Sequence, residues 1–242
     1  IELFRSIEAG GSDPLDSVHP IERPAQDIDH MMGIGGASLE DMRARWVEAC
    51  LAYDEPRVER ILSQSFAVYP VELVCLELLL RGISEIGDLW YQGKATVQQE
   101  HFASALVLRR LDALIAASPS PTREEKILIG CPAKEEHVLA ALIATLFLRR
   151  HGWDVIYLGA NVPLENLEQA VQRTSAELVI LLASQLNTAA NLYTAACSLQ
   201  SAGIPLAFAG SIFSKQVRLK QRIPGYYLGE HLERIVNEVE IG

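Results

Sequence analysis

The sequence has little of what secreted, membrane-spanning or nucleic-acid-binding chains carry. Its four cysteines have neither the paired spacing of a metal site nor that of a disulfide framework, which indicates reduced thiols. No uninterrupted apolar run is long enough to form a membrane helix. The formal net charge is −10, so the chain is poorly suited to hold nucleic acid unaided. These absences favour a cytoplasmic protein that makes no membrane contact.

The chain does contain enough apolar sequence for two buried cores, because 49% of its 242 residues are hydrophobic. A stretch of Ser and Pro over residues 118–122 is typical of a linker. We therefore expect one domain over residues 38–117 and another over residues 125–242. Residues 1–37 contain two glycine-rich stretches, and we interpret them as a tether or as the remnant of an upstream domain.

The second domain has five apolar segments separated by helical stretches. The third segment is apolar on both faces, as a buried parallel strand is. Because crossovers between parallel strands are right-handed, this alternation predicts an α/β domain with a doubly wound, flavodoxin-like sheet of five parallel strands. The expected strands are residues 127–130, 154–158, 177–183, 205–209 and 226–228.

A small or hydroxyl-bearing residue stands at the end of each expected strand. Ordinary turn chemistry explains any one of them. In an open α/β sheet, however, ligands bind outside the carboxyl ends of the strands, so all of them together would leave room for a long, narrow group. These residues are Gly130, Gly159, Ser184, Gly210 and Gly229.

His137 follows the first expected strand and precedes an apolar helix that we expect from Val138 to Arg150. This position puts an imidazole nitrogen at the mouth of the expected site. Glu135, two residues earlier, could hold the other ring nitrogen and so fix the tautomer of a metal-binding histidine. The local pattern also leaves open a solvated or helix-capping histidine.

The first domain is predicted to be a four-helix bundle. Ser38 and Thr96 each begin a capping box, and Pro56 and Pro70 suit the first turns of helices. Gly93 separates the third helix from the fourth. The helix boundaries therefore have local causes.

Trp90 lies near the end of the third helix, and Glu100 lies one turn into the fourth. Both side chains could point into one cavity, as an apolar plate beside a hydrogen-bond acceptor. The alternative is that Trp90 belongs to the ordinary core and that Glu100 is a solvated acid near the helix dipole.

The second domain resembles the cobalamin-binding Rossmann-like domain. That family carries Asp-x-His-x-x-Gly, then Ser-x-Leu-x-Thr, then Gly-Gly. The corresponding segments here read Glu135-Glu136-His137-Val138-Leu139-Ala140, Ser184-Gln185-Leu186-Asn187-Thr188 and Ala209-Gly210. The second motif matches in full, whereas Glu135, Ala140 and Ala209 depart from the family pattern.

This resemblance implies that His137 replaces the cofactor's own benzimidazole as the lower cobalt ligand. The nucleotide tail of the cofactor would then pass Ser184 and Gly210. The candidate cofactor-binding residues of this domain are Glu135, His137, Gly159, Ser184, Leu186, Thr188 and Gly210, with His137 alone on the metal.

The two domains together resemble the light-responsive adenosylcobalamin regulators of the CarH type. The helical cap of that family carries a Trp followed ten and eleven positions later by Glu-His, as Trp90 is followed here by Glu100 and His101. The resemblance implies that Trp90 covers the adenosyl group and that Glu100 binds its ribose. Trp90, Tyr91, Glu100 and His101 are the candidate cofactor-binding residues of the cap.

Tyr91 departs from that pattern. The best-known members of the family carry His at this position, and its imidazole takes the upper cobalt site once light has expelled the adenosyl group. A neutral phenol is a poorer ligand than imidazole. His101 lies about 100° around the helix from Glu100, so we do not expect both to face the cofactor. We therefore expect a photoproduct with water or a weak ligand on the upper face.

The resemblance implies a cobalamin-dependent light sensor rather than an enzyme. It would regulate transcription or a partner through loss of the upper ligand of adenosylcobalamin, as a homo-oligomer that reaches DNA only through an upstream domain. Two alternatives stay open. One is a stand-alone photosensor that adds a bilin and resembles the photocobilins, and the other is a corrinoid methyl carrier for a methyltransferase.

Overall fold

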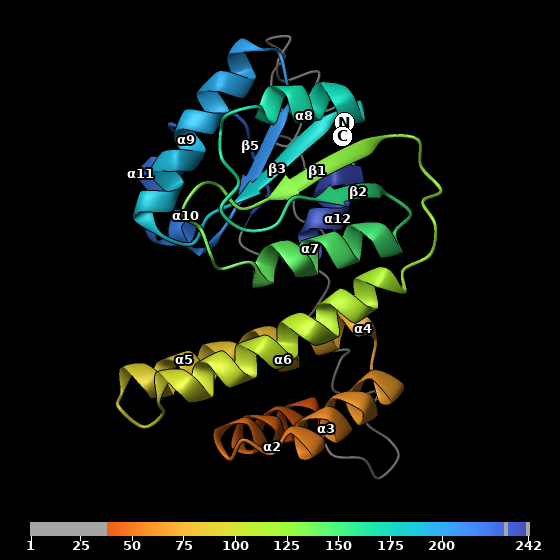
Figure 1. The fold of residues 1–242 in the computed structure, drawn as a ribbon, viewed down its shortest axis with the longest axis vertical. Helices are drawn as coiled ribbons and strands as arrows, with labels where there is room; N and C mark the ends of the chain where they lie inside the picture. The colour runs from red at the N-terminus through yellow and green to blue at the C-terminus, as the bar shows by residue number, and fades with distance from the viewer. Residues whose placement is uncertain (1–37, 230–231, 241–242) are drawn as a thin grey trace, which may run out of the picture. The chain divides into compact units, whose positions relative to one another are not determined.

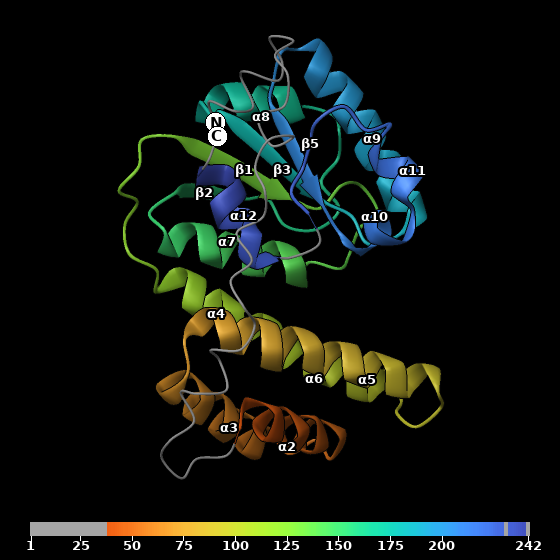
Figure 2. The same cartoon turned by 180° about the vertical axis from the view of Figure 1, so that it is seen from behind.

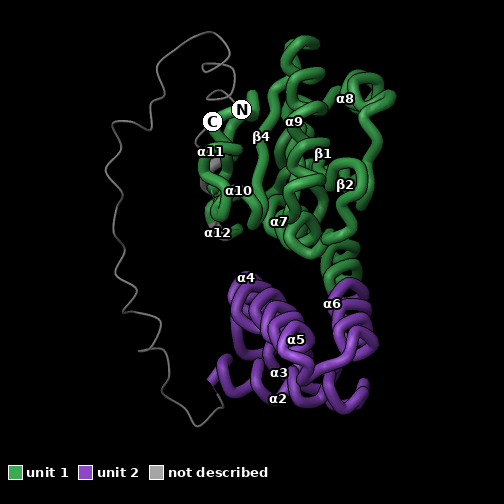
Figure 3. Tube along the Cα trace, turned by 90° about the vertical axis from the view of Figure 1, so that its left-hand side faces the viewer, with its two compact units in different colours: residues 1–12, 111–242 green, residues 13–110 purple. Residues whose placement is uncertain are grey.

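A computed structural model describes residues 38–229 and 232–240, so the predicted tether over residues 1–37 lies outside the described residues. The chain forms two compact units (Figure 3). Residues 38–110 belong to a helical unit, and the residues from 111 onward belong to an α/β unit. Within the described ranges, no helix is long and apolar enough to cross a membrane.

The helical unit is a bundle whose first and last helices begin at capping boxes, as predicted. The Ser38 hydroxyl accepts a hydrogen bond from the Asp41 N–H at 3.1 Å, and the Asp41 carboxylate accepts one from the Ser38 N–H at 3.1 Å. Thr96 and Gln99 form the same reciprocal pair. The helices are α2 (Leu39–Leu51), α3 (Glu55–Val68), α4 (Val71–Leu73), α5 (Arg81–Tyr91) and α6 (Val97–Ala116), with a π-helix over Val74–Leu80 (Figure 1).

The π-helix lies between α4 and α5, and the three follow without a break as the third predicted helix. The sequence pattern did not predict this local widening of the helix. A π-helical turn changes which backbone carbonyls find a partner. The Arg43 guanidinium donates to the Glu77 carbonyl at 3.0 Å and to the Glu85 carboxylate at 2.6 Å. Arg43 thus ties α2 to the widened turn and to the helix that follows it.

Trp46 of α2 is fully buried in the helical unit, and Gly82 of α5 makes room for its ring. A Cβ atom at Gly82 would lie 2.8 Å from the nearest ring carbon of Trp46, which is closer than real Cβ contacts allow. Gly87 lies on the same helix, and a Cβ atom there would meet nothing within 4 Å. The two glycines therefore differ in what holds them at their positions.

Replacing these two glycines by alanine should change stability in opposite directions. Gly82→Ala should lower the free energy of unfolding by about 1–3 kcal/mol, because the new methyl group overpacks a filled core. Gly87→Ala should raise it by about 0.5–1 kcal/mol, because alanine loses less backbone freedom on folding than glycine. Urea unfolding of both variants would measure this. Equal stability of the two would contradict the close packing at Trp46.

The α/β unit contains a sheet of five parallel strands in the order β2-β1-β3-β4-β5. This is the flavodoxin-like order, so the predicted fold class is confirmed. The strands are β1 (Lys126–Gly130), β2 (Asp154–Tyr157), β3 (Leu178–Leu182), β4 (Leu206–Ala209) and β5 (Tyr226–Tyr227). β2, β4 and β5 are each one residue shorter than the expected ranges, β3 is two residues shorter, and β1 begins one residue earlier.

Helices cover both faces of the sheet. Alternate strand residues, among them Val179, Leu181 and Phe208, belong to one core cluster with α8 and α9. On the opposite face, α7 packs against β2 and α12 (Figure 2). The helices are α7 (Leu139–Arg150), α8 (Leu167–Thr174), α9 (Leu186–Ser201), α10 (Ser211–Lys215), α11 (Val217–Lys220) and α12 (Leu232–Glu240).

The strand order places two distant chain segments side by side. β1 pairs directly with β3, and Gly130 at the end of β1 is in register with Leu181 near the end of β3. The loop after β1 and the start of α9 therefore meet at the carboxyl edge of the sheet, although α7, β2 and α8 separate them in sequence. This is also the point where the strand order reverses and where open α/β sheets bind ligands.

Candidate functional site

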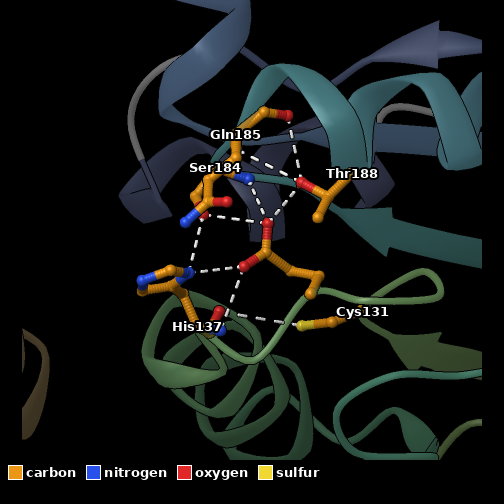
Figure 4. A network of polar contacts seen from close by, with 6 residues as sticks. Cys131, His137, Ser184, Gln185 and Thr188 are labelled. Atoms are coloured by element: carbon orange, nitrogen blue, oxygen red, sulfur yellow. Dashed lines mark hydrogen bonds and ion pairs between the residues drawn. The ribbon is translucent and has the colours of Figure 1, made fainter.

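Glu135 is buried at the carboxyl edge of the sheet, with 1% of its surface exposed. Its carboxylate accepts hydrogen bonds from the N–H and Nδ1 of His137 at 3.0 and 2.6 Å. On its other oxygen it accepts from the N–H and hydroxyl of Ser184 at 2.7 and 2.9 Å, and from the Thr188 hydroxyl at 2.6 Å. Figure 4 shows this network, which joins the loop after β1 to the start of α9.

These hydrogen bonds decide the protonation of Glu135. Burial acts to raise the pKa of its carboxyl, because a low dielectric penalises the charge. Hydrogen bonds from the Thr188 hydroxyl, the Ser184 N–H and His137 outweigh burial and lower the pKa from 4.5 to about 2. Glu135 is therefore a carboxylate at neutral pH, and it is the one charged residue among those whose side chains are described as buried.

His137 is oriented by this carboxylate. Its Nδ1 faces Glu135 and lies 3.1 Å from the Ser184 hydroxyl. When Nδ1 carries the proton of a neutral ring, Nε2 keeps a free lone pair. The His137 side chain is 62% exposed, so that nitrogen can be reached from solvent. The pair has the carboxylate–histidine arrangement by which proteins orient an imidazole toward a metal.

The start of α9 has a local cause. The Thr188 hydroxyl accepts a hydrogen bond from the Gln185 N–H at 3.2 Å, in a capping box that begins this helix. The same hydroxyl donates to Glu135. The partial positive charge of a helix N-terminus also favours a carboxylate next to Ser184. Capping and carboxylate binding therefore share Thr188.

The three other candidates of this unit lie at the same edge of the sheet. Leu186 is the first residue of α9 and is 63% exposed. The Gly159 carbonyl accepts a hydrogen bond from the Cys131 N–H, and a Cβ atom at Gly159 would meet nothing within 4 Å. Gly210 has a φ of +136°, and a Cβ atom there would lie 1.8 Å from the Ala183 carbonyl oxygen. Backbone packing alone therefore requires glycine at position 210.

The four cap candidates lie around the turn between α5 and α6. Trp90 and Tyr91 are 46% and 88% exposed, so neither belongs to the core of the helical unit. The Glu100 carboxylate accepts from the Ser104 hydroxyl at 2.6 Å and lies 2.7 Å from His101 Nδ1. The side chains of Glu100 and His101 thus reach each other despite their angular separation on the helix. Ser104 was not predicted from the sequence. Its position one turn after Glu100 indicates that the two side chains can contact each other.

The structure thus gathers Glu135, His137, Ser184 and Thr188 in one network, and it gathers Glu100, His101 and Ser104 in another on the helical unit. Each contains a histidine whose Nδ1 faces a carboxylate. Among the described residues, no group of three or more His, Cys, Asp or Glu could hold a free metal ion.

Comparison with known families identifies the family to which the chain belongs. Family models that describe a B12 binding domain match residues 42–115 and residues 125–235. The chain belongs to the B12-binding family. The two matched ranges cover the helical segment and the α/β segment in turn, and B12 is cobalamin.

Two curated relatives are transcriptional repressors of Myxococcus xanthus. The chain is 37% identical to the HTH-type transcriptional repressor CarH over 132 residues, which cover 54% of this chain and 44% of CarH. It is 32% identical to the HTH-type transcriptional repressor CarA over 143 residues, which cover 59% of this chain and 48% of CarA. The chain thus matches about half the length of these relatives. The predicted resemblance to CarH-type proteins is confirmed.

A solved structure has the same fold. The monomethylamine corrinoid protein of Methanosarcina barkeri aligns with a TM-score of 0.71 at 13% identity, over 85% of this chain and 100% of that chain. The residues present also fit a corrinoid. The corrin ring of that cofactor itself surrounds the cobalt, so the protein would have to offer only a nitrogen donor. The exposed, carboxylate-oriented ring of His137 would provide one.

Glu135→Gln should lower stability in a pH-dependent way. The amide cannot accept on both sides, so buried donors lose partners and the free energy of unfolding at pH 7 should fall by about 1–3 kcal/mol. Because the folded pKa lies below 4.5, this difference should be complete above pH 4.5 and should shrink as the pH falls toward 2. Urea unfolding at several pH values measures it. The exposed neighbour provides a control, and an equal effect of Glu136→Gln would contradict the assignment.

Proposed function

We propose that this protein is a cobalamin-dependent light sensor of the CarH type that binds adenosylcobalamin and regulates transcription or a partner. The observation that carries the proposal is the buried Glu135 network, which orients His137 within a B12-binding domain. A second B12-binding domain with Trp90, Glu100 and His101 precedes it. The identity of 37% to the repressor CarH supports the regulatory part of the proposal.

The residues of the α/β unit would hold the cofactor from below. His137 would donate Nε2 to cobalt, and Glu135 would keep the ring in the tautomer that leaves Nε2 free. Ser184, Leu186, Thr188, Gly159 and Gly210 would border the nucleotide tail. When bound, adenosylcobalamin would supply a cobalt–carbon bond that visible light breaks.

The helical unit would recognise the upper group. Trp90 offers an indole face that is half exposed, and Glu100 offers a carboxylate that accepts hydrogen bonds. Trp90 would pack against the adenosyl group, and Glu100 would accept from its ribose. After illumination both residues would lose these contacts. The populations of the cap conformations would then shift, and so would those of a homo-oligomer built on the cap.

Contact with DNA would need a further domain. The formal charge of −10 repels phosphate, and CarH and CarA are named as HTH-type repressors. A domain upstream of this chain would therefore make the DNA contact, while this chain would report the state of the cofactor. Alternatively, the chain would regulate a partner protein instead of transcription.

A corrinoid methyl carrier for a methyltransferase is the second candidate. The fold shared with the monomethylamine corrinoid protein favours it, because that protein aligns over its whole length. A carrier has no use for a cap that selects the adenosyl group, so ligand selectivity separates the two functions.

His137→Ala should change how cobalamin is bound. The wild type should bind hydroxocobalamin with the absorption spectrum of imidazole-coordinated cobalt, and His137→Ala should give a base-off spectrum or lose the cofactor. The exposed His151, which lies at the end of α7, provides the control variant His151→Ala. A wild-type spectrum retained by His137→Ala would sink the assignment. Red-absorbing bands in protein purified from cells would reveal an added bilin.

Trp90→Ala should abolish a preference for adenosylcobalamin over methylcobalamin. Stacking of a base on an aromatic ring contributes about 1–3 kcal/mol, so the wild type should bind adenosylcobalamin roughly 5- to 150-fold more tightly. Dissociation constants measured in the dark for both cofactors test this.

The control for that comparison is Val68→Ala, which truncates an exposed apolar side chain at the end of α3 in the same unit. It should keep the preference. Equal affinity of the wild type for the two cofactors, with no change in hydrodynamic size on illumination, would favour the methyl carrier.

A further inference from the structure

The loop that carries Glu135 has an unusual backbone. Lys134, its neighbour, has a φ of +68°, a left-handed conformation that costs free energy for a residue with a Cβ atom. Such conformations persist only where the surroundings enforce them, and they cluster at functional sites. Lys134 lies in a turn that the Glu135 N–H closes onto the Pro132 carbonyl at 2.9 Å, and a pocket of about 210 Å³ borders the loop at Pro132 and Ala133.

Asn161 holds the loop from the turn after β2. Its side-chain oxygen accepts a hydrogen bond from the Lys134 N–H at 2.7 Å, and its own N–H donates to the Glu135 carbonyl at 3.0 Å. Asn161 itself has a φ of +52°, which asparagine tolerates better than most residues with a Cβ atom. One residue thus fixes the backbone on both sides of the peptide bond between Lys134 and Glu135.

Asn191 holds the same loop from α9. Its side-chain amide donates to the Ala133 carbonyl at 2.6 Å. Thr188 lies three residues earlier on the same face of this helix and donates to the Glu135 carboxylate. One face of α9 therefore binds the loop at its backbone and at its buried side chain.

We propose that Asn161 and Asn191 are positioning residues for His137. By holding the backbone of residues 133–135, they keep the Glu135 carboxylate within hydrogen-bond distance of His137 Nδ1. The orientation of the His137 ring is therefore fixed before any cofactor binds. That His137 would bind cobalt rests on the proposed function. The orientation of its ring is a property of the chain alone and can be measured without cofactor.

The test compares four variants of the full chain. Asn161→Gly keeps the left-handed backbone but removes the acceptor, and Asn161→Asp restores an acceptor oxygen. Asn191→Ala removes the donor from α9. Asn166→Gly is the matched control, because Asn166 lies on the same β2–α8 connection with a φ of +67° and makes no side-chain cap hydrogen bond.

One measurement uses the cofactor-free protein. Nuclear magnetic resonance of ¹⁵N-labelled histidine reports whether the Nδ1 proton of His137 is hydrogen-bonded. We expect this signature in the wild type, Asn161→Asp and Asn166→Gly, and its loss in Asn161→Gly and Asn191→Ala. A simple loss of stability would not be reversed by Asn161→Asp.

The other measurement uses hydroxocobalamin as the probe. Asn161→Gly and Asn191→Ala should bind it roughly 10- to 100-fold more weakly, with a larger base-off fraction, as is usual when groups behind a metal ligand are removed. Variants that match Asn166→Gly in both measurements would overturn the inference. If the wild type binds no hydroxocobalamin, the proposed function fails, and the histidine signature alone decides the inference. If Asn161→Gly does not fold, Asn191→Ala decides it.

Discussion

The buried carboxylate of Glu135 is the interaction on which the α/β unit depends. Removing a charge from water costs several kcal/mol unless hydrogen bonds replace the lost hydration. Here the replacement comes from His137, Ser184 and Thr188, which supply five hydrogen bonds. A carboxylate at this position is stable only when the loop after β1 and the start of α9 are both in place.

This requirement couples stability to the site. The carboxylate that these hydrogen bonds keep ionised also accepts from Nδ1 of His137, so the network that stabilises the buried charge also orients an exposed imidazole. The glycine at position 210 serves the same edge, because the end of β4 approaches Ala183 too closely for any side chain. The architecture of this edge of the sheet and the chemistry of the site therefore have common causes.

The two carboxylate–histidine pairs differ in burial. Glu135 is buried among donors from separate chain segments, whereas the Glu100 side chain is 24% exposed and contacts His101 and Ser104 of its own helix. A group held by distant segments keeps its geometry, and a group held by near neighbours on an exposed helix can exchange partners at little cost. In the proposed sensor, the first behaviour suits a permanent lower ligand. The second suits a contact that is lost after illumination.

Sequence by itself determined the order and nature of the elements. The apolar segments predicted all five strands, the capping residues Ser38 and Thr96 predicted two helix starts, and the spacing of Glu135 and His137 predicted their contact. These features rest on local chemistry: strand hydrophobicity, side chains that bond backbone within one turn, and residues two positions apart. The familiar Ser-x-Leu-x-Thr motif also made Thr188 a candidate, although its hydrogen bond to Glu135 could not be read from the motif.

Only the tertiary structure decided what meets Glu135 and how its loop is held. Ser184 and Thr188 reach the carboxylate because β1 and β3 are neighbours. Asn191 contacts the loop from α9, and Asn161 contacts it from the turn after β2. The π-helix and the place of Gly82 against Trp46 likewise depend on packing across the bundle. Such contacts join residues that are far apart in sequence. A local sequence pattern does not specify which distant residue will pack at a given position, so these features could be identified only from the tertiary structure.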